Sequence, residues 1–173
     1  MSLIRKYIKK QLIRFTEPSE LLFESHIEKA KHNLFVASLL QENSLTDWQI
    51  ITSYYAIYHS IIGLLNRIGI ISKNHNASIL LLENIFIKEN ILKKHEIEKV
   101  KEIKNLKKEI MEQDVKKIKN IKEIRVDAQY TIKTNFKNEI ADNTLNFARN
   151  FVSKIERIEI KDNIFKIVEN LKC

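Results

Sequence analysis

The sequence predicts an all-α protein, an antiparallel up-and-down four-helix bundle with extra short helices. Apolar residues recur every three or four positions in nearly every segment, which is the spacing of one helix face, and no stretch alternates as a strand would. The chain has only 2 Gly and 1 Pro, too few for the turns of an all-β fold. Its 173 residues suit one domain with a single core.

We therefore expect a single helical domain over residues 1–173, with its core at about 19–159. Residues 1–14 form a basic amphipathic segment, which we expect to dock as a short helix on its own domain. It lacks the apolar region and cleavage site of a signal peptide. The first long helix is expected at about 19–42, after Pro18 and with Thr16 as its cap.

The second long helix is expected to begin at a capping box formed by Thr46 and Gln49, and to run to about Arg67. Gly69 follows as the natural left-handed terminator. This helix is apolar around most of its circumference, which predicts a central, buried position. A loop over 70–74 and a short helix over 76–87 should follow.

The second half of the chain should contain a helical stretch over about 90–133, broken near 112–114. The last long helix is expected at about 138–159, with one apolar face. Asp162 is a candidate cap for a short C-terminal helix over 163–171.

Charge and cysteine content bound the function. The net charge is +8, and residues 1–14 and 88–125 each carry five more basic than acidic residues. We interpret the Lys-rich 88–125 stretch first as a solvated helix face and second as a phosphate-binding surface. The one cysteine, Cys173, excludes an internal disulfide, and no apolar run could span a membrane. A cytoplasmic protein is expected.

The histidines and glycines of the sequence exclude several classes of catalytic site. The five histidines show no metal-ligand spacing, so we expect neither a metal nor a cofactor. Two glycines cannot build a phosphate loop or a nucleophile elbow. On the second long helix, small and polar residues share one face, which allows either close helix packing or a polar pocket. The face comprises Thr52, Ala56, His59 or Ser60, Gly63, and Asn66 or Arg67.

Two residues stand out as candidates. His59 lies on that face. It is either a core histidine that is hydrogen-bonded to a neighbour or a catalytic group. Arg125 shares a helix face with apolar residues, so it needs an acceptor. It would either pair with a carboxylate and fix the helix register, or point at a phosphate in a cleft or subunit interface. The candidate carboxylates are Asp127, Glu83 and Glu42.

An ordered set of motifs resembles one known family. The set comprises Ala30-Lys31-x-Asn33-Leu34-x-x-Ala37, Tyr54-Tyr55-Ala56-x-Tyr58-His59, Leu64-Leu65, Gly69, Ser72-Lys73-x-His75, Arg125-x-x-Ala128-x-Tyr130 and Ala148-x-x-Phe151-Val152. Its order and spacing over about residues 20–158 resemble those of HEPN-domain proteins, and more narrowly of the small stand-alone bacterial and archaeal subfamily. The resemblance implies a four-helix bundle that usually forms a homodimer.

The resemblance also implies a chemistry. Many HEPN proteins are metal-independent ribonucleases, in which an Arg and a His four to six residues later act at the dimer cleft. Others pair with minimal nucleotidyltransferases as toxin–antitoxin systems, and a tyrosine near the motif can be adenylylated. Here the positions of that His hold Gln129, Tyr130 and Thr131. His59 or His75 would have to supply the proton transfer.

These observations favour an RNA- or nucleotide-binding homodimer of toxin–antitoxin or defence type, with a degenerate ribonuclease site. An active RNA endonuclease using Arg125 with His59 or His75 is the alternative, and a structural partner of a nucleotidyltransferase antitoxin is a further one. The candidate nucleic-acid or nucleotide contacts are Arg125, Tyr130, Tyr55, Lys73 and Asp127. No membrane partner is expected.

Overall fold

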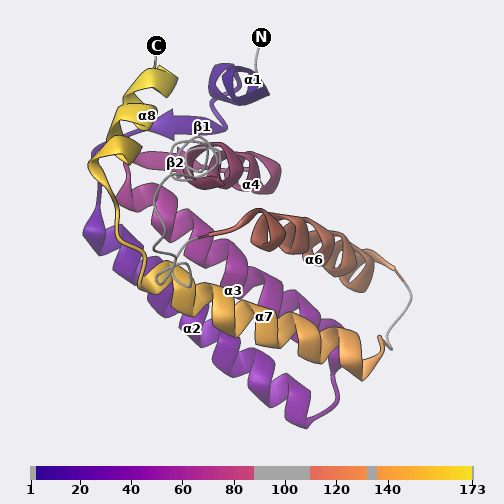
Figure 1. Ribbon diagram of the computed structural model, residues 1–173. Helices are drawn as coiled ribbons and strands as arrows, with labels where there is room; N and C mark the ends of the chain where they lie inside the picture. The colour runs from indigo at the N-terminus through magenta and orange to yellow at the C-terminus, as the bar shows by residue number, and fades with distance from the viewer. Residues whose placement is uncertain (1–2, 88–109, 132–135, 173) are drawn as a thin grey trace, which may run out of the picture.

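Four long helices form the body of the protein in the computed structural model, which describes residues 3–87, 110–131 and 136–172. They are α2 (Glu20–Glu42), α3 (Thr46–Arg67), α6 (Glu112–Tyr130) and α7 (Asn138–Glu156). Helices α2, α3 and α7 lie side by side, and α6 packs on α3 (Figure 1). The predicted all-α helical bundle is confirmed.

Helix α3 is the central element, as its apolar circumference predicted. Fifteen of its 22 residues are buried, and it contacts α2, α6, α7 and α4. Gly63 lets α2 approach closely, because a Cβ there would lie 3.0 Å from the Cβ of His26. On α2, the residues that pack inward recur at helical spacing: Phe23, Ile27, Ala30 and Ala37 are buried, and Leu34 is partly buried.

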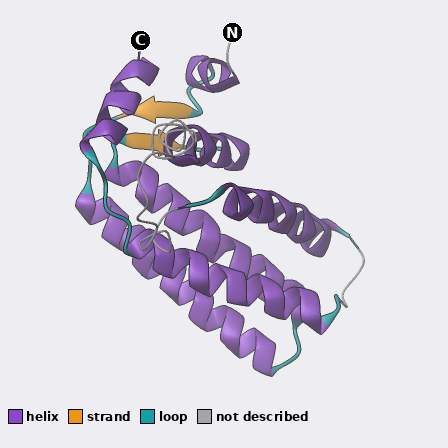
Figure 2. Ribbon diagram, in the orientation of Figure 1, coloured by secondary structure: helices purple, strands orange, loops and turns teal. Residues whose placement is uncertain are grey.

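The shorter elements gather at one end of the bundle, near both chain termini (Figures 1 and 2). They are α1 (Leu3–Lys9), β1 (Ile13–Phe15), β2 (Ile70–Ser72), α4 (His75–Leu82), the π-helical turn η1 (Glu83–Ile87) and α8 (Asp162–Lys172). Helix α1 docks on the domain through Ile4, which is 6% exposed.

Two short strands, β1 and β2, correct the expectation of a loop at 70–74. Strands β1 and β2 pair antiparallel, with Ile13 opposite Ser72 and Phe15 opposite Ile70. Each strand has three residues. That is shorter than the four to eight residues over which alternation can be recognised. The ribbon ties the N-terminal segment to the end of the bundle.

The caps predicted for the first two long helices were wrong. Ser19, not Thr16, caps α2, and its side chain accepts a hydrogen bond from the Leu22 amide at 3.2 Å. Helix α3 has no side-chain cap, because other parts of the fold engage the expected capping residues. The Thr46 hydroxyl accepts from the Phe136 amide, and Gln49 donates to Asp142 of α7.

Gly69 ends α3 as predicted. Its φ is +77°, and a Cβ there would lie 2.5 Å from the Thr16 carbonyl oxygen. The short helix expected at 76–87 divides into α4 and η1, and the last long helix stops at Glu156 rather than 159. Of the helical stretch expected over about 90–133, residues 90–109 and 132–133 lie outside the described residues. In the described part of the chain, no helix has the length and hydropathy needed to cross a membrane.

Candidate functional site

Arg125 and His75 meet beside three tyrosines of α3. Arg125 comes from the middle of α6, and His75 is the first residue of α4. The tyrosines are Tyr54, Tyr55 and Tyr58, and each has its ring within 6.4 Å of the His75 ring, centroid to centroid. We call these five residues the Arg–His–Tyr cluster. It joins two polar groups that lie 50 positions apart in the sequence.

The guanidinium of Arg125 is held by aromatic groups and not by a carboxylate. Its Nη2 donates to the Tyr55 hydroxyl at 2.5 Å. Its Cζ lies 5.5 Å from the centre of the Tyr54 ring and 5.1 Å from that of Tyr55. No described carboxylate pairs with Arg125, and its buried Nε has no hydrogen-bond partner among the described residues. The ion pair considered from the sequence is absent from this part of the chain, because Glu83 pairs with Lys119 instead.

His75 is fixed on two sides. Its Nδ1 lies 2.6 Å from the Tyr54 hydroxyl, and its ring stacks on Tyr58 at a centroid distance of 3.8 Å. Burial lowers the pKa of His75 below its usual value, and the positive charges of Arg125 and Lys122 lower it further. The imidazole is therefore neutral at pH 7, with one ring nitrogen able to accept a proton.

Tyr54 and Tyr58 stay protonated at physiological pH. Burial raises the pKa of Tyr54, against the opposing effect of the Arg125 charge, and burial also raises the pKa of Tyr58. Neutral hydroxyls can donate and accept hydrogen bonds, so the cluster combines one fixed positive charge with a neutral base and phenolic donors. Such a set suits an anion such as a phosphate.

His59 lies apart from the cluster. Its Nδ1 is 3.1 Å from the Nδ1 of His26 on α2, and the two rings stack at 5.3 Å between centroids. Burial, then the charges of His26 and Lys29, lower the pKa of His59 to about 4. Of the two histidines considered from the sequence, the structure therefore places His75 with Arg125, and turns His59 toward α2.

Three other candidates lie on the surface, and among the described residues no hydrogen bond or ring contact joins their side chains to the cluster. Lys73 is exposed, and its backbone amide donates to the Leu12 carbonyl next to the ribbon. Asp127 is exposed on α6. Tyr130 ends that helix with 72% of its surface exposed.

Sequence reasoning missed two members of the cluster, Tyr54 and Tyr58. The signal was present, because they are four residues apart and therefore share the helix face that receives His75. Over residues 3–87, 110–131 and 136–172, no group of three or more His, Cys, Asp or Glu residues could hold a metal ion.

Comparison with known proteins identifies the family to which this arrangement belongs. The family model of the HEPN domain matches residues 23–158, which include most of α2, all of α3, α4, α6 and α7, and every member of the Arg–His–Tyr cluster. No curated protein matches the chain.

Proposed function

The chain belongs to the HEPN family, and on this premise we propose that it binds RNA or a nucleotide in a toxin–antitoxin or defence system. Arg125 is the proposed phosphate contact, with Tyr55 orienting its guanidinium and His75 facing the same phosphate. The family supports a HEPN-type function in general terms, and the cluster geometry supports this more specific role.

One observation carries the proposal. Arg125 is half-buried, yet its only hydrogen bond among the described residues goes to a neutral hydroxyl. A charge removed from water without an opposite charge is unfavourable unless a partner compensates it. A phosphate would supply that charge and accept hydrogen bonds from the planar guanidinium.

The position of His75 favours cleavage as a second candidate function. In a metal-independent ribonuclease, a base takes the proton of the 2′-hydroxyl, whose oxygen attacks the adjacent phosphorus as the bond to the 5′-oxygen breaks. A cation stabilises the negative charge that develops on the phosphate, and an acid protonates the leaving oxygen. Neutral His75 is placed to act as the base and Arg125 as the cation, which makes up for the histidine missing near position 130.

We further propose a homodimer and, as partner, a minimal nucleotidyltransferase. The exposed hydroxyl-bearing ring of Tyr130 could be reached by such a partner. A specific dimer should bury at least ~1,200 Å² in total. Sedimentation showing only monomer at micromolar concentration would contradict the dimer.

Binding and cleavage can be tested on one RNA and its DNA counterpart. Binding alone predicts that His75→Gln weakens affinity modestly and that no product appears. Cleavage predicts fragments ending in a 2′,3′-cyclic phosphate from RNA, none from DNA, and a loss with His75→Gln of about 10²-fold or more in rate. His59→Gln is the matched control, because His59 lies against α2, and it should change neither. Equal losses in both variants would refute the role of His75.

A further inference from the structure

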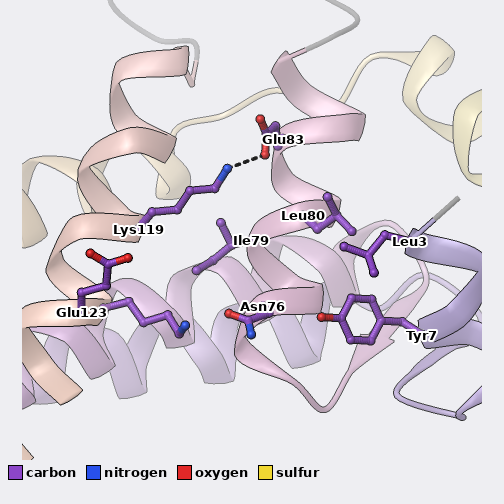
Figure 3. A pocket seen from close by; sticks show the side chains of 9 residues that line it. Leu3, Tyr7, Asn76, Ile79, Leu80, Glu83, Lys119 and Glu123 are labelled. Atoms are coloured by element: carbon purple, nitrogen blue, oxygen red, sulfur yellow. Dashed lines mark hydrogen bonds and ion pairs between the residues drawn. The ribbon is translucent and has the colours of Figure 1, made fainter.

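A hollow of about 320 Å³ lies between α1, α4, η1 and α6 (Figure 3). Its size falls at the lower end of the range for small-molecule pockets, about 300–1,000 Å³. One wall is apolar, with Leu3 of α1 and Leu80 of α4 close together. On the same side as Leu3, the Tyr7 hydroxyl points toward Asn76 of α4. The lining thus offers apolar surface and a few directed polar groups.

The hollow and the cluster share the same two helices. Asn76 directly follows His75 at the start of α4. Lys122, which lines the hollow, precedes Arg125 by nearly one turn of α6, and its charge acts on His75. The start of α4 and the same turn of α6 therefore contribute side chains both to the hollow and to the Arg–His–Tyr cluster.

The charges around the hollow balance. Lys119 is neutralised by Glu83 at 2.8 Å (Figure 3). Lys122 and Glu123 are neighbours of opposite sign, and neither has an ion-pair partner among the residues that the structure describes. A balanced lining does not select an anion. It suits a neutral, flat group that gives and takes hydrogen bonds at its edges and is apolar on its faces.

We propose that this hollow binds the nucleobase of the nucleotide whose phosphate contacts Arg125. The Asn76 amide, which has both donors and an acceptor, would pair with the edge of the base. The faces of the base would lie against Leu80 and the other apolar side chains of the wall. The inference rests on the proposed phosphate site, and it assigns the base a separate set of contacts.

Part of this base site lies outside the matched family domain. Leu3 and Tyr7 belong to α1, whereas the family model begins at residue 23. Helix α1 reaches the hollow because the β1–β2 ribbon holds the N-terminal segment at this end of the bundle. The N-terminal segment would thus add recognition of a base to the phosphate site of the HEPN core.

Calorimetric titration of the full chain with two probes separates the base from the phosphate. Adenosine 5′-monophosphate carries both groups, whereas ribose 5-phosphate lacks the base. A base held against side chains contributes roughly five- to a hundredfold in affinity, so the nucleotide should bind tighter than the sugar phosphate by at least about fivefold.

Three variants complete the design. Asn76→Ala removes an exposed amide, and should weaken nucleotide binding roughly two- to tenfold while leaving ribose 5-phosphate unchanged. Tyr7→Phe removes only a hydroxyl and should act in the same direction. Asn150→Ala, the same change on the exposed surface of α7, is the matched control and should change nothing.

The outcomes distinguish the two proposals. Equal affinity for the two probes, or an Asn76→Ala variant that binds the nucleotide as tightly as the wild type, would overturn the base site. If Arg125→Lys leaves both affinities unchanged, the phosphate site fails whatever the base does. Absence of binding of either probe at millimolar concentration would overturn both.

Discussion

Substituting Arg125 with alanine removes one hydrogen bond, to the Tyr55 hydroxyl, and the contacts of the guanidinium with the rings of Tyr54 and Tyr55. The substitution also removes a buried Nε donor that has no partner among the described residues. The first loss destabilises the fold, whereas the second relieves an existing cost. The free energy of unfolding therefore depends on the difference between the two.

The terms can be given rough sizes. A hydrogen bond to a charged group contributes about 1.5–3 kcal/mol. A partly exposed cation–π contact adds about 0.5–1 kcal/mol. An unsatisfied buried donor costs about 1–3 kcal/mol. The net loss of stability should thus be about 1 kcal/mol, or a decrease of roughly 2–4 °C in Tm for a chain of this size.

Binding should respond more strongly than stability. Loss of a charged hydrogen bond to phosphate, at about 1.5–3 kcal/mol, weakens affinity by roughly ten- to a hundredfold. Arg125→Lys keeps the charge without the planar fork, so it should weaken binding with little change in Tm. Arg149→Ala is a matched control, because Arg149 also donates to a hydroxyl on a neighbouring helix, that of Ser38 at 2.8 Å. Melting and RNA titration are measured on all three variants.

The reasoning would be refuted by the opposite pattern. A loss of about 3–5 kcal/mol in Arg125→Ala is the size expected when a buried ion pair is broken. Combined with unchanged affinity in Arg125→Lys, it would show that Arg125 holds the fold together and does not contact phosphate.

Three further predictions concern stability. Gly69→Ala should cost at least about 2 kcal/mol, because φ is +77° and the new Cβ would clash with a backbone oxygen; a Tm within 2 °C of wild type would contradict this. Lys154→Met breaks the ion pair with Asp114, whose side chains are 19% and 10% exposed, and should lower the free energy of unfolding by about 2 kcal/mol. Lys31→Met breaks the exposed pair with Glu156 and should lower it by under about 1 kcal/mol. Denaturant unfolding that ranks these two the other way would refute the role of burial. Folding lowers the pKa of His59 to about 4. Between about pH 6.5 and pH 4, the unfolded chain therefore binds a proton at His59 and the folded chain does not. The free energy of unfolding should fall by about 1–2 kcal/mol as the pH decreases over this range. His59→Gln should flatten this pH dependence, and an unchanged slope would contradict the assignment.

The helices could be predicted because their signals are local. The apolar spacing of α2 and α3 and the Gly69 terminator each act within a few residues, and the observed elements follow them closely. The caps were mispredicted where tertiary contacts compete. Thr46 and Gln49 have the side chains of a capping box, but Phe136 and Asp142 bind them instead. These partners lie more than 80 positions away along the chain, and no local pattern reveals them.

At the candidate site, too, local features could be predicted from the sequence and tertiary contacts could not. The position of Arg125 on an apolar face followed from helix spacing, and so did its need for an acceptor. The acceptor in the structure is the hydroxyl of Tyr55 from a neighbouring helix, whereas the sequence alone leaves a carboxylate and a phosphate as the two alternatives. Which side chain meets Arg125 depends on how α3 and α6 are aligned, and this alignment is set by packing along the whole bundle.

His59 and His75 were equivalent candidates from the sequence for a site with Arg125, and helix packing decides between them. His59 and Gly63 are four residues apart on α3, so they share a face. Gly63 brings that face against α2. A Cβ added at Gly63 would lie only 3.0 Å from the Cβ of His26. Gly63 therefore indicates close packing of α2 and α3 on this face. His59 lies on the same face, and it contacts His26 of α2. His75 belongs to another element, and the chain reversal at Gly69 carries it back to the tyrosine face of α3, where Arg125 of α6 also lies.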